Sequence, residues 1–216
     1  GRVFPKDMKA APLLRAWLHR LRAGGAQFHM RHRWLGWDAA GALRFAAAQG
    51  EQIVTADAVV LALGGGSWAR LGSDGAWVPL LQARGVSVAP LVPANCGFDV
   101  GTEQRKGWSD KLTEQYAGHA FKLVAIRFTD SQGQHFERKG EFVLTQSGVE
   151  GSLIYAVSAL LREEIARYGS ATFYLDLLPD WTADRVLTEV AHPRGARSLS
   201  SHLKGRLKIE GIKAAM

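Results

Sequence analysis

The sequence has only one cysteine, Cys96, among its 216 residues. A single thiol excludes an internal disulfide framework and a metal site built from several cysteines, and a reducing compartment is the simplest setting for it. No apolar run approaches the roughly 18 residues that a membrane-spanning helix needs. The N-terminus also lacks the charged-then-apolar pattern of a secretory signal, so we expect a cytoplasmic protein with no membrane partner.

Blocks of like charge are missing as well, although Lys and Arg outnumber Asp and Glu by 27 to 20, a net charge of +7. Scattered basic residues are typical of a solvated surface, and nucleic acid is therefore an unlikely partner. The largest basic group comprises Arg194, Arg197, Lys204, Arg206, Lys208 and Lys213. His19, His29 and His32 have no carboxylate or cysteine spaced with them as a co-ligand, so we expect no metal site.

What the sequence does contain is a glycine-rich stretch from Asp57 to Gly75. An unbroken apolar run, residues 58–63, leads into three glycines, residues 64–66, and a second glycine loop follows at residues 72–75. An apolar run without alternation predicts a strand buried on both faces of a parallel sheet. Glycines after such a strand allow backbone N–H groups to approach a ligand, although a strand-to-helix turn without a ligand has the same pattern.

Helical spacing of leucines and Trp17 predicts an amphipathic helix over residues 8–23, ended by Gly24 and Gly25. Alternation predicts a strand at residues 26–35, and a small hairpin or meander follows at residues 43–47 and 52–55. A short helix is expected within residues 75–84. The order helix, strand, meander, buried strand, glycine loop and helix indicates an α/β unit.

The second half is predicted to be rich in strands after a boundary near Pro93 to Cys96. Antiparallel strands are expected at residues 117–129, 134–138 and 141–144, with turns at residues 130–133 and at Lys139-Gly140.

Helical patterns close the chain. Apolar spacing predicts a helix over residues 153–168, ended by Gly169, and a strand follows at residues 172–177. Thr182 can cap a helix over residues 183–191, and Ser198 or Ser200 can cap another that runs through Leu203.

Four motifs, in this order along the chain, resemble those of one bacterial family. They are Gly1-Arg2-Val3-Phe4-Pro5 with Lys9-Ala10; Leu61 to Trp68 with Gly72-Ser73 and Gly75; Gly140 to Thr145 with Gly148 and Gly151; and Asp176-Leu177-Leu178-Pro179. The family is that of the NAD(P)/FAD-dependent oxidoreductases, two-dinucleotide-binding flavoproteins that include bile-acid dehydroxylation reductase and proteins described as aminoacetone oxidases. The order of the motifs makes the match specific, although each motif alone is weak.

The resemblance implies an α/β fold with a β-rich insert. Residues 1–95 would be part of a Rossmann-like FAD-binding domain, residues 96–180 an inserted antiparallel β domain, and residues 181–216 the start of a small helical domain. The family's N-terminal Gly-x-Gly-x-x-Gly turn, which holds the cofactor pyrophosphate at a helix N-terminus, and its C-terminal return to the flavin domain are not in this sequence. We therefore expect a central fragment of a longer enzyme.

Several positions depart from the family's usual residues. Leu63 stands where the Ala-Thr-Gly-Gly signature has threonine, and Asp74 stands where the common Gly-Ser-Thr-Gly loop has threonine. Gln146 and Ser152 also replace residues that many members share. The chain is expected to form a branch apart from the named members, so their substrates do not transfer to it.

The resemblance implies FAD as the cofactor, with NAD(P)H as a candidate electron donor and a small molecule as substrate. Leu63 and the loop of Gly64, Gly65, Gly66 and Ser67 would lie along the flavin ribityl or pyrophosphate region. Trp34 would lie where related proteins offer backbone to the adenine, or it is simply a packed tryptophan.

Arg2 would face the isoalloxazine, where a guanidinium can stabilise negative charge on reduced flavin, or it forms a surface ion pair. No side chain is assigned to catalysis, because the flavin carries the electron chemistry. The alternative function is a basic nucleic-acid or protein interaction module with no flavin role.

Overall fold

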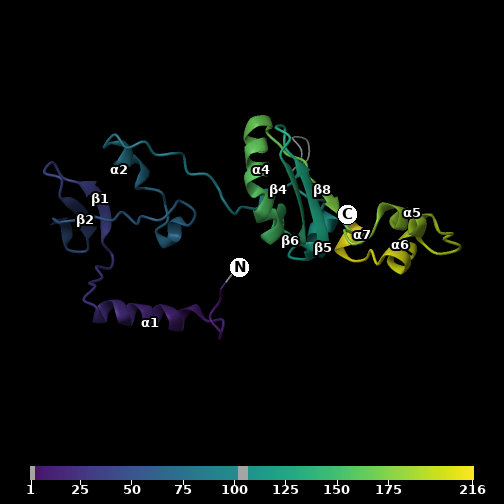
Figure 1. The fold of residues 1–216 in the computed structure, drawn as a ribbon, viewed down its shortest axis with the longest axis horizontal. Coiled ribbons are helices and arrows are strands. Elements are labelled where there is room, and N and C mark those ends of the chain that lie inside the picture. Colours follow the sequence, from purple (N-terminus) through teal and green to yellow (C-terminus); the bar gives the residue numbers. More distant parts are fainter. Residues whose placement is uncertain (1–2, 102–106) are drawn as a thin grey trace. The chain divides into compact units, whose positions relative to one another are not determined.

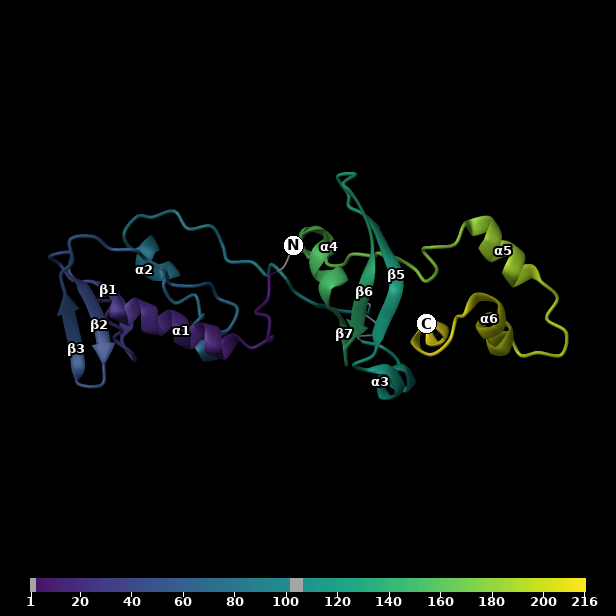
Figure 2. The same ribbon diagram turned by 60° about the horizontal axis from the view of Figure 1, so that its bottom comes forward.

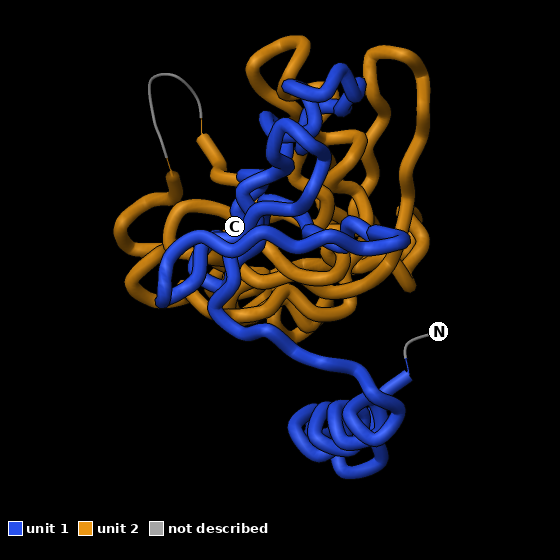
Figure 3. Tube along the Cα trace, turned by 90° about the vertical axis from the view of Figure 1, so that its left-hand side faces the viewer, with its two compact units in different colours: residues 1–91 blue, residues 92–216 orange. Residues whose placement is uncertain are grey.

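The computed structural model describes residues 3–101 and 107–216. The chain divides into two compact units, residues 1–91 and residues 92–216, which Figure 3 distinguishes by colour. Neither unit has, within the described residues, a helix that is long and apolar enough to cross a membrane. The predicted division into segments 1–95, 96–180 and 181–216 stays a prediction.

The first unit combines one long helix with a small antiparallel sheet. Strands β1, β2 and β3 lie side by side in that order, and both pairings are antiparallel (Figure 2). The predicted meander at residues 43–55 is thus confirmed as the hairpin β2–β3. The elements are α1 (Ala10–Ala23), β1 (Arg33–Trp37), β2 (Leu43–Ala47), β3 (Gly50–Val54), the 3-10 turn η1 (Ala69–Leu71) and α2 (Val78–Gln82).

Two predicted strands of this unit are wrong in whole or in part. The strand predicted at residues 26–35 begins only at Arg33, where pairing with β2 becomes available. The buried strand predicted at residues 58–63 is not formed, and Val60 in its middle is 90% exposed. A strand exists only when a neighbour pairs with its backbone, and none of the described strands pairs with this run.

The first unit has very little core of its own. Leu43 is its one buried hydrophobic side chain among the described residues. The apolar stripe of α1 lies open, with Leu13, Leu14 and Trp17 each at least half exposed. A segment of this length needs a substantial buried apolar surface to offset the entropy lost when the chain folds. The exposed apolar stripe of α1 is therefore suited to packing against further protein.

The second unit is built on a five-stranded antiparallel sheet in the order β4-β7-β6-β5-β8. Helix α4 packs against one face of this sheet (Figure 1). The predicted antiparallel set is therefore confirmed in outline. The elements are β4 (Phe98–Asp99), α3 (Asp110–Tyr116), β5 (Ala120–Thr129), β6 (His135–Leu144), β7 (Gly148–Glu150), α4 (Ser152–Tyr168), β8 (Tyr174–Asp176), α5 (Ala183–Ala191), α6 (Leu199–Leu207) and α7 (Ile212–Ala215).

The core of the second unit lies between α4 and the sheet. Leu153 and Ile154 of α4 are buried with Phe121 and Ile126 of β5. The Phe121 ring stacks on that of Phe142 from β6, with centroids 4.8 Å apart. These contacts fix the register of the two long strands, since a shift by one residue would turn the aromatic side chains out of the core.

The predicted turn at Lys139-Gly140 is wrong, because β6 continues through it. Gly140 pairs with Val124, and its missing side chain leaves room for Leu153, which would be 3.4 Å from a Cβ at this position. Glycine here serves helix-to-sheet contact and not a turn. The turn predicted at residues 130–133 does form, with the Asp130 carboxylate accepting from the Gln132 and Gln134 amides.

The predicted helix caps of the last segment are confirmed. Thr182 Oγ1 accepts from the Arg185 amide at 3.3 Å at the start of α5. Ser198, one of the two predicted alternatives, accepts from the Ser201 amide at 3.2 Å and starts α6, which runs to Leu207. The sequence patterns did not predict α3 or β7, both of which are short.

Candidate functional site

The glycine loop at residues 63–67 is held against the second glycine loop by two hydrogen bonds. The Gly75 amide donates to the Gly65 carbonyl at 3.1 Å, and Trp77 Nε1 donates to the Gly64 carbonyl at 3.1 Å. Both carbonyls are thus engaged by the protein. The loop of predicted site residues from Leu63 to Ser67 is therefore held in place by Gly75 and Trp77.

The amide side of this loop is open. None of the four N–H groups from Gly64 to Ser67 donates to a protein acceptor within the described part of the chain. Gly64 to Ser67 are exposed and Leu63 is half-buried. Exposed neighbouring backbone donors without protein partners are suited to an anionic or oxygen-rich ligand.

Glycine is required in this loop for two separate reasons. Gly64 and Gly75 have φ angles of +71° and +68°, a region that other residues rarely adopt. Gly66 and Gly75 approach each other closely, and a Cβ on either would lie 3.0 or 3.1 Å from Leu91 Cδ1. Leu91 was not predicted as part of this site, and only its position before Pro93 hints at a loop residue.

Asp74 has a structural role that explains how it replaces the usual threonine. Its Oδ1 accepts from the Ala76 amide at 3.0 Å, which shapes the turn into α2. Its Oδ2 lies 3.6 Å from a guanidinium nitrogen of Arg33 in β1. The ion pair is largely solvent-exposed and contributes little energy, but it connects the second glycine loop to the strand that carries Trp34.

Trp34 is half-buried in β1, and its ring meets that of Trp37 edge-on with centroids 4.8 Å apart. Its indole Nε1 is buried without a hydrogen-bond partner in the described structure. A buried donor without an acceptor is costly and is commonly matched by water or a ligand. The structure does not bring Trp34 into direct contact with the Gly64–Ser67 loop, and Arg2 lies outside the described residues.

Some of the histidines and basic residues considered in the sequence have partners within the protein. The two ring nitrogens of His32 face the Met30 carbonyl and the Gln52 side chain. Among the described residues, no group of three or more His, Cys, Asp or Glu side chains is placed to hold a metal ion. Of the basic group near the C-terminus, Arg206 pairs with Glu189 and Lys204 with Glu210, both at 2.7 Å.

The third family motif forms the tight connection from β6 to β7. The Thr145 amide donates to the Gly148 carbonyl at 2.8 Å, and Thr145 Oγ1 accepts from the Gly148 amide at 2.9 Å. Gly148 has no room for a side chain because β4 lies directly against it. Gly151 has a φ of +109° where α4 begins. These motif residues are explained by packing and not by a ligand.

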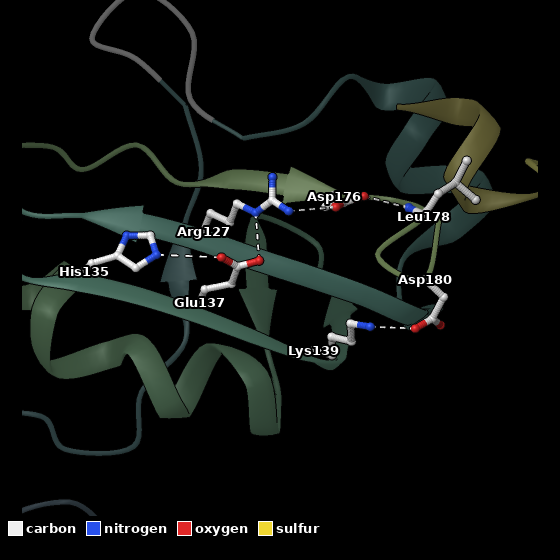
Figure 4. Close-up of polar contacts among 7 residues, drawn as sticks. All are labelled: Arg127, His135, Glu137, Lys139, Asp176, Leu178 and Asp180. Atoms are coloured by element: carbon white, nitrogen blue, oxygen red, sulfur yellow. Dashed lines mark hydrogen bonds and ion pairs between the residues drawn. The ribbon is translucent and has the colours of Figure 1, made fainter. Parts of the chain in front are cut away.

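The fourth motif, at residues 176–179, belongs to a polar ladder on the outer face of the sheet (Figure 4). Asp176 Oδ1 accepts from the Leu178 amide at 2.9 Å, which forms the turn, and its Oδ2 lies 3.4 Å from Arg127. Arg127 also donates to Glu137 at 2.9 Å. This hydrogen bond lowers the pKa of Glu137 and raises that of Arg127.

Comparison with known proteins shows which family this sequence belongs to. The model of the HI0933-like protein Rossmann domain matches residues 1–193. No curated protein matches the chain. The matched region includes the open glycine loop, Trp34 and all four motifs. The chain therefore belongs to the HI0933-like Rossmann-domain family, which is of the FAD-binding oxidoreductase type.

Proposed function

We propose that this chain is the central part of an FAD-dependent oxidoreductase that moves electrons or hydride to or from a small molecule. The single observation that carries the proposal is the row of four backbone N–H groups from Gly64 to Ser67 with no acceptor among the described residues. It lies inside the region that matches the family model. NAD(P)H is the proposed electron donor.

The residues of the loop fit a flavin dinucleotide. Backbone N–H groups can donate to the ribityl oxygens or the pyrophosphate, and the carbonyls of Gly64 and Gly65 are already engaged by Trp77 and Gly75. Trp34 is the proposed second point of contact, at the place where related proteins offer backbone to the adenine. When bound, FAD supplies the electron chemistry, while this chain binds and orients it.

The open surfaces of the first unit support a role as part of a larger flavin domain. The run at Val59, Val60 and Leu61 is apolar but exposed, and it leads directly into the glycine loop. The stripe on α1 is exposed in the same way. A further sheet strand beside residues 58–63 would cover that run and would complete the buried strand that its apolar pattern predicts.

The direct test is to purify the full-length protein that contains these residues and measure flavin released on denaturation. We expect stoichiometric FAD, and a preparation that neither contains nor takes up flavin would overturn the proposal. The 216 residues alone are expected to hold FAD poorly, because the predicted pyrophosphate-binding turn is not among them. Stoichiometric binding by these residues alone would contradict this second expectation.

A matched pair of glycine variants tests the loop itself. A Cβ at Gly65 would meet nothing closer than Ser73 Oγ at 3.8 Å, so Gly65→Ala preserves the backbone while adding a methyl group beside the open amides. We expect FAD affinity to fall about tenfold or more. Gly205→Ala in α6, where the space around the Cβ is open, is the control and should leave FAD affinity unchanged.

A further inference from the structure

Ser73 is fixed between two backbone hydrogen bonds that leave its side chain free. The Ser73 amide donates to the Trp68 carbonyl at 3.2 Å, and the Trp68 amide donates to the Ser73 carbonyl at 3.0 Å. The two residues form an isolated antiparallel bridge that closes the loop containing η1. Because both of its backbone groups are used, the remaining hydrogen-bonding group of Ser73 is its hydroxyl.

That hydroxyl lies over the open glycines. Ser73 Oγ is 3.8 Å from the Cβ position of Gly64 and 3.8 Å from that of Gly65. A methyl group at either position would be in ordinary van der Waals contact with the hydroxyl, so the hydroxyl lies directly beside the glycine loop. Ser73 itself is half-buried, and its backbone conformation is set by the Trp68 bridge.

The hydroxyl has no hydrogen-bond partner in the part of the chain that the structure describes. Ser73 Oγ is not among the buried polar atoms that lack a partner in the described residues, so the hydroxyl is accessible and free to bond a ligand. It lies beside Gly64 and Gly65, whose amides are donors with no acceptor among the described residues. A group that accepts from several donors at once is an oxyanion, and phosphate is the oxyanion that a flavin nucleotide carries.

From this geometry we propose that Ser73 is a cofactor-contacting residue that donates its hydroxyl hydrogen to a phosphate oxygen held by the amides of Gly64 to Ser67. The inference rests on the proposed function, since the flavin nucleotide supplies the phosphate. Asp74 and Trp77 act as positioning residues: Asp74 accepts from the Ala76 amide and shapes the turn, and Trp77 donates to the Gly64 carbonyl.

The test compares wild type with Ser73→Ala and Ser73→Thr in the full-length apoprotein. Titrations use FAD, ADP and riboflavin, of which only riboflavin lacks a phosphate. We expect Ser73→Ala to weaken FAD and ADP about tenfold, the size of a hydrogen bond to a charged group, and to leave riboflavin unchanged. Ser73→Thr keeps a hydroxyl and should restore most of the affinity. Ser170→Ala, on an exposed loop, is the control variant.

The outcomes separate this inference from the proposed function. Wild-type binding of FAD with unchanged affinity in Ser73→Ala would overturn the role of Ser73 alone. An equal loss for riboflavin would also overturn it, because the contact would then be to the ribityl chain and not to phosphate. Failure of the wild type to bind any flavin would overturn both. Circular dichroism melting of each variant identifies a loss of affinity that arises from unfolding.

Discussion

Gly148→Ala is expected to detach the edge strand β4 from the sheet. A Cβ at position 148 would lie 1.9 Å from the Phe98 carbonyl oxygen and 2.7 Å from Asp99 Cα. Both atoms belong to backbone, so no side-chain rotation relieves the clash. Residues 98–99 would have to move away by more than about 1 Å before the new Cβ and the Phe98 carbonyl oxygen reach an ordinary van der Waals distance.

The magnitude follows from what β4 loses when it moves. Phe98 pairs with Val149, and the Val100 amide donates to the Ser147 carbonyl at 3.0 Å. Each such hydrogen bond contributes about 1 kcal/mol, and Phe98 also packs partly on the core. We therefore expect a loss of about 2–4 kcal/mol in the free energy of unfolding.

Urea unfolding and hydrogen exchange measure this loss. Exchange at the Val100 amide should accelerate first, because it reports the detachment of β4 directly. Gly205→Ala is the matched control, since it lies in a helix with open space around its Cβ and should stabilise by about 0.5–1 kcal/mol. If Gly148→Ala stays within about 0.5 kcal/mol of wild type with the Val100 amide still protected, the packing argument is wrong.

Three further predictions concern the polar contacts of the second unit. Thr182→Ala should destabilise α5 by about 1 kcal/mol, seen as faster exchange of its amides, because the cap hydrogen bond is lost. Arg127→Met should raise the pKa of Glu137 toward its usual 4.5, measured by NMR titration. In the wild type the Arg127–Glu137 pair stabilises the fold above pH 4.5, and this contribution is lost as pH falls through the lowered pKa of Glu137. If the pKa of Glu137 is the same in Arg127→Met as in the wild type, the pair does not cause the shift. Lys213 is partly buried, and desolvation lowers its pKa below 10.5. Its contribution to the free energy of unfolding should therefore become more favourable as pH rises from the lowered pKa to 10.5, and Lys213→Met should abolish this slope in unfolding experiments.

Sequence patterns predicted the elements whose signals are local. The helix at residues 183–191 and its Thr182 cap follow from a side chain that bonds its own neighbouring backbone, so no distant residue is needed. The two long strands β5 and β6 follow from alternation and from the Asp130 turn between them. The false turn at Gly140 shows the opposite case, because its glycine is explained only by Leu153 from another element.

The candidate site was predictable in position but not in detail. Three successive glycines after an apolar run indicate an open loop, and the resemblance to a flavoprotein family predicts FAD as its ligand. Sequence patterns could not predict the residues that hold this loop in place. Trp77 and Leu91 contact it from later segments, and these contacts depend on how the chain folds back. The prediction of a strand at residues 58–63 was wrong because none of the described strands pairs with this run.

The exposed run at Val59, Val60 and Leu61 has a consequence for handling the protein. Its backbone is unpaired in the described structure and its side chains are apolar, a combination that favours strand addition by another chain. We therefore expect the solubility of these 216 residues in isolation to be limited by this short stretch despite the net charge of +7. Val60→Lys, at its 90% exposed centre, should suppress concentration-dependent association in light scattering.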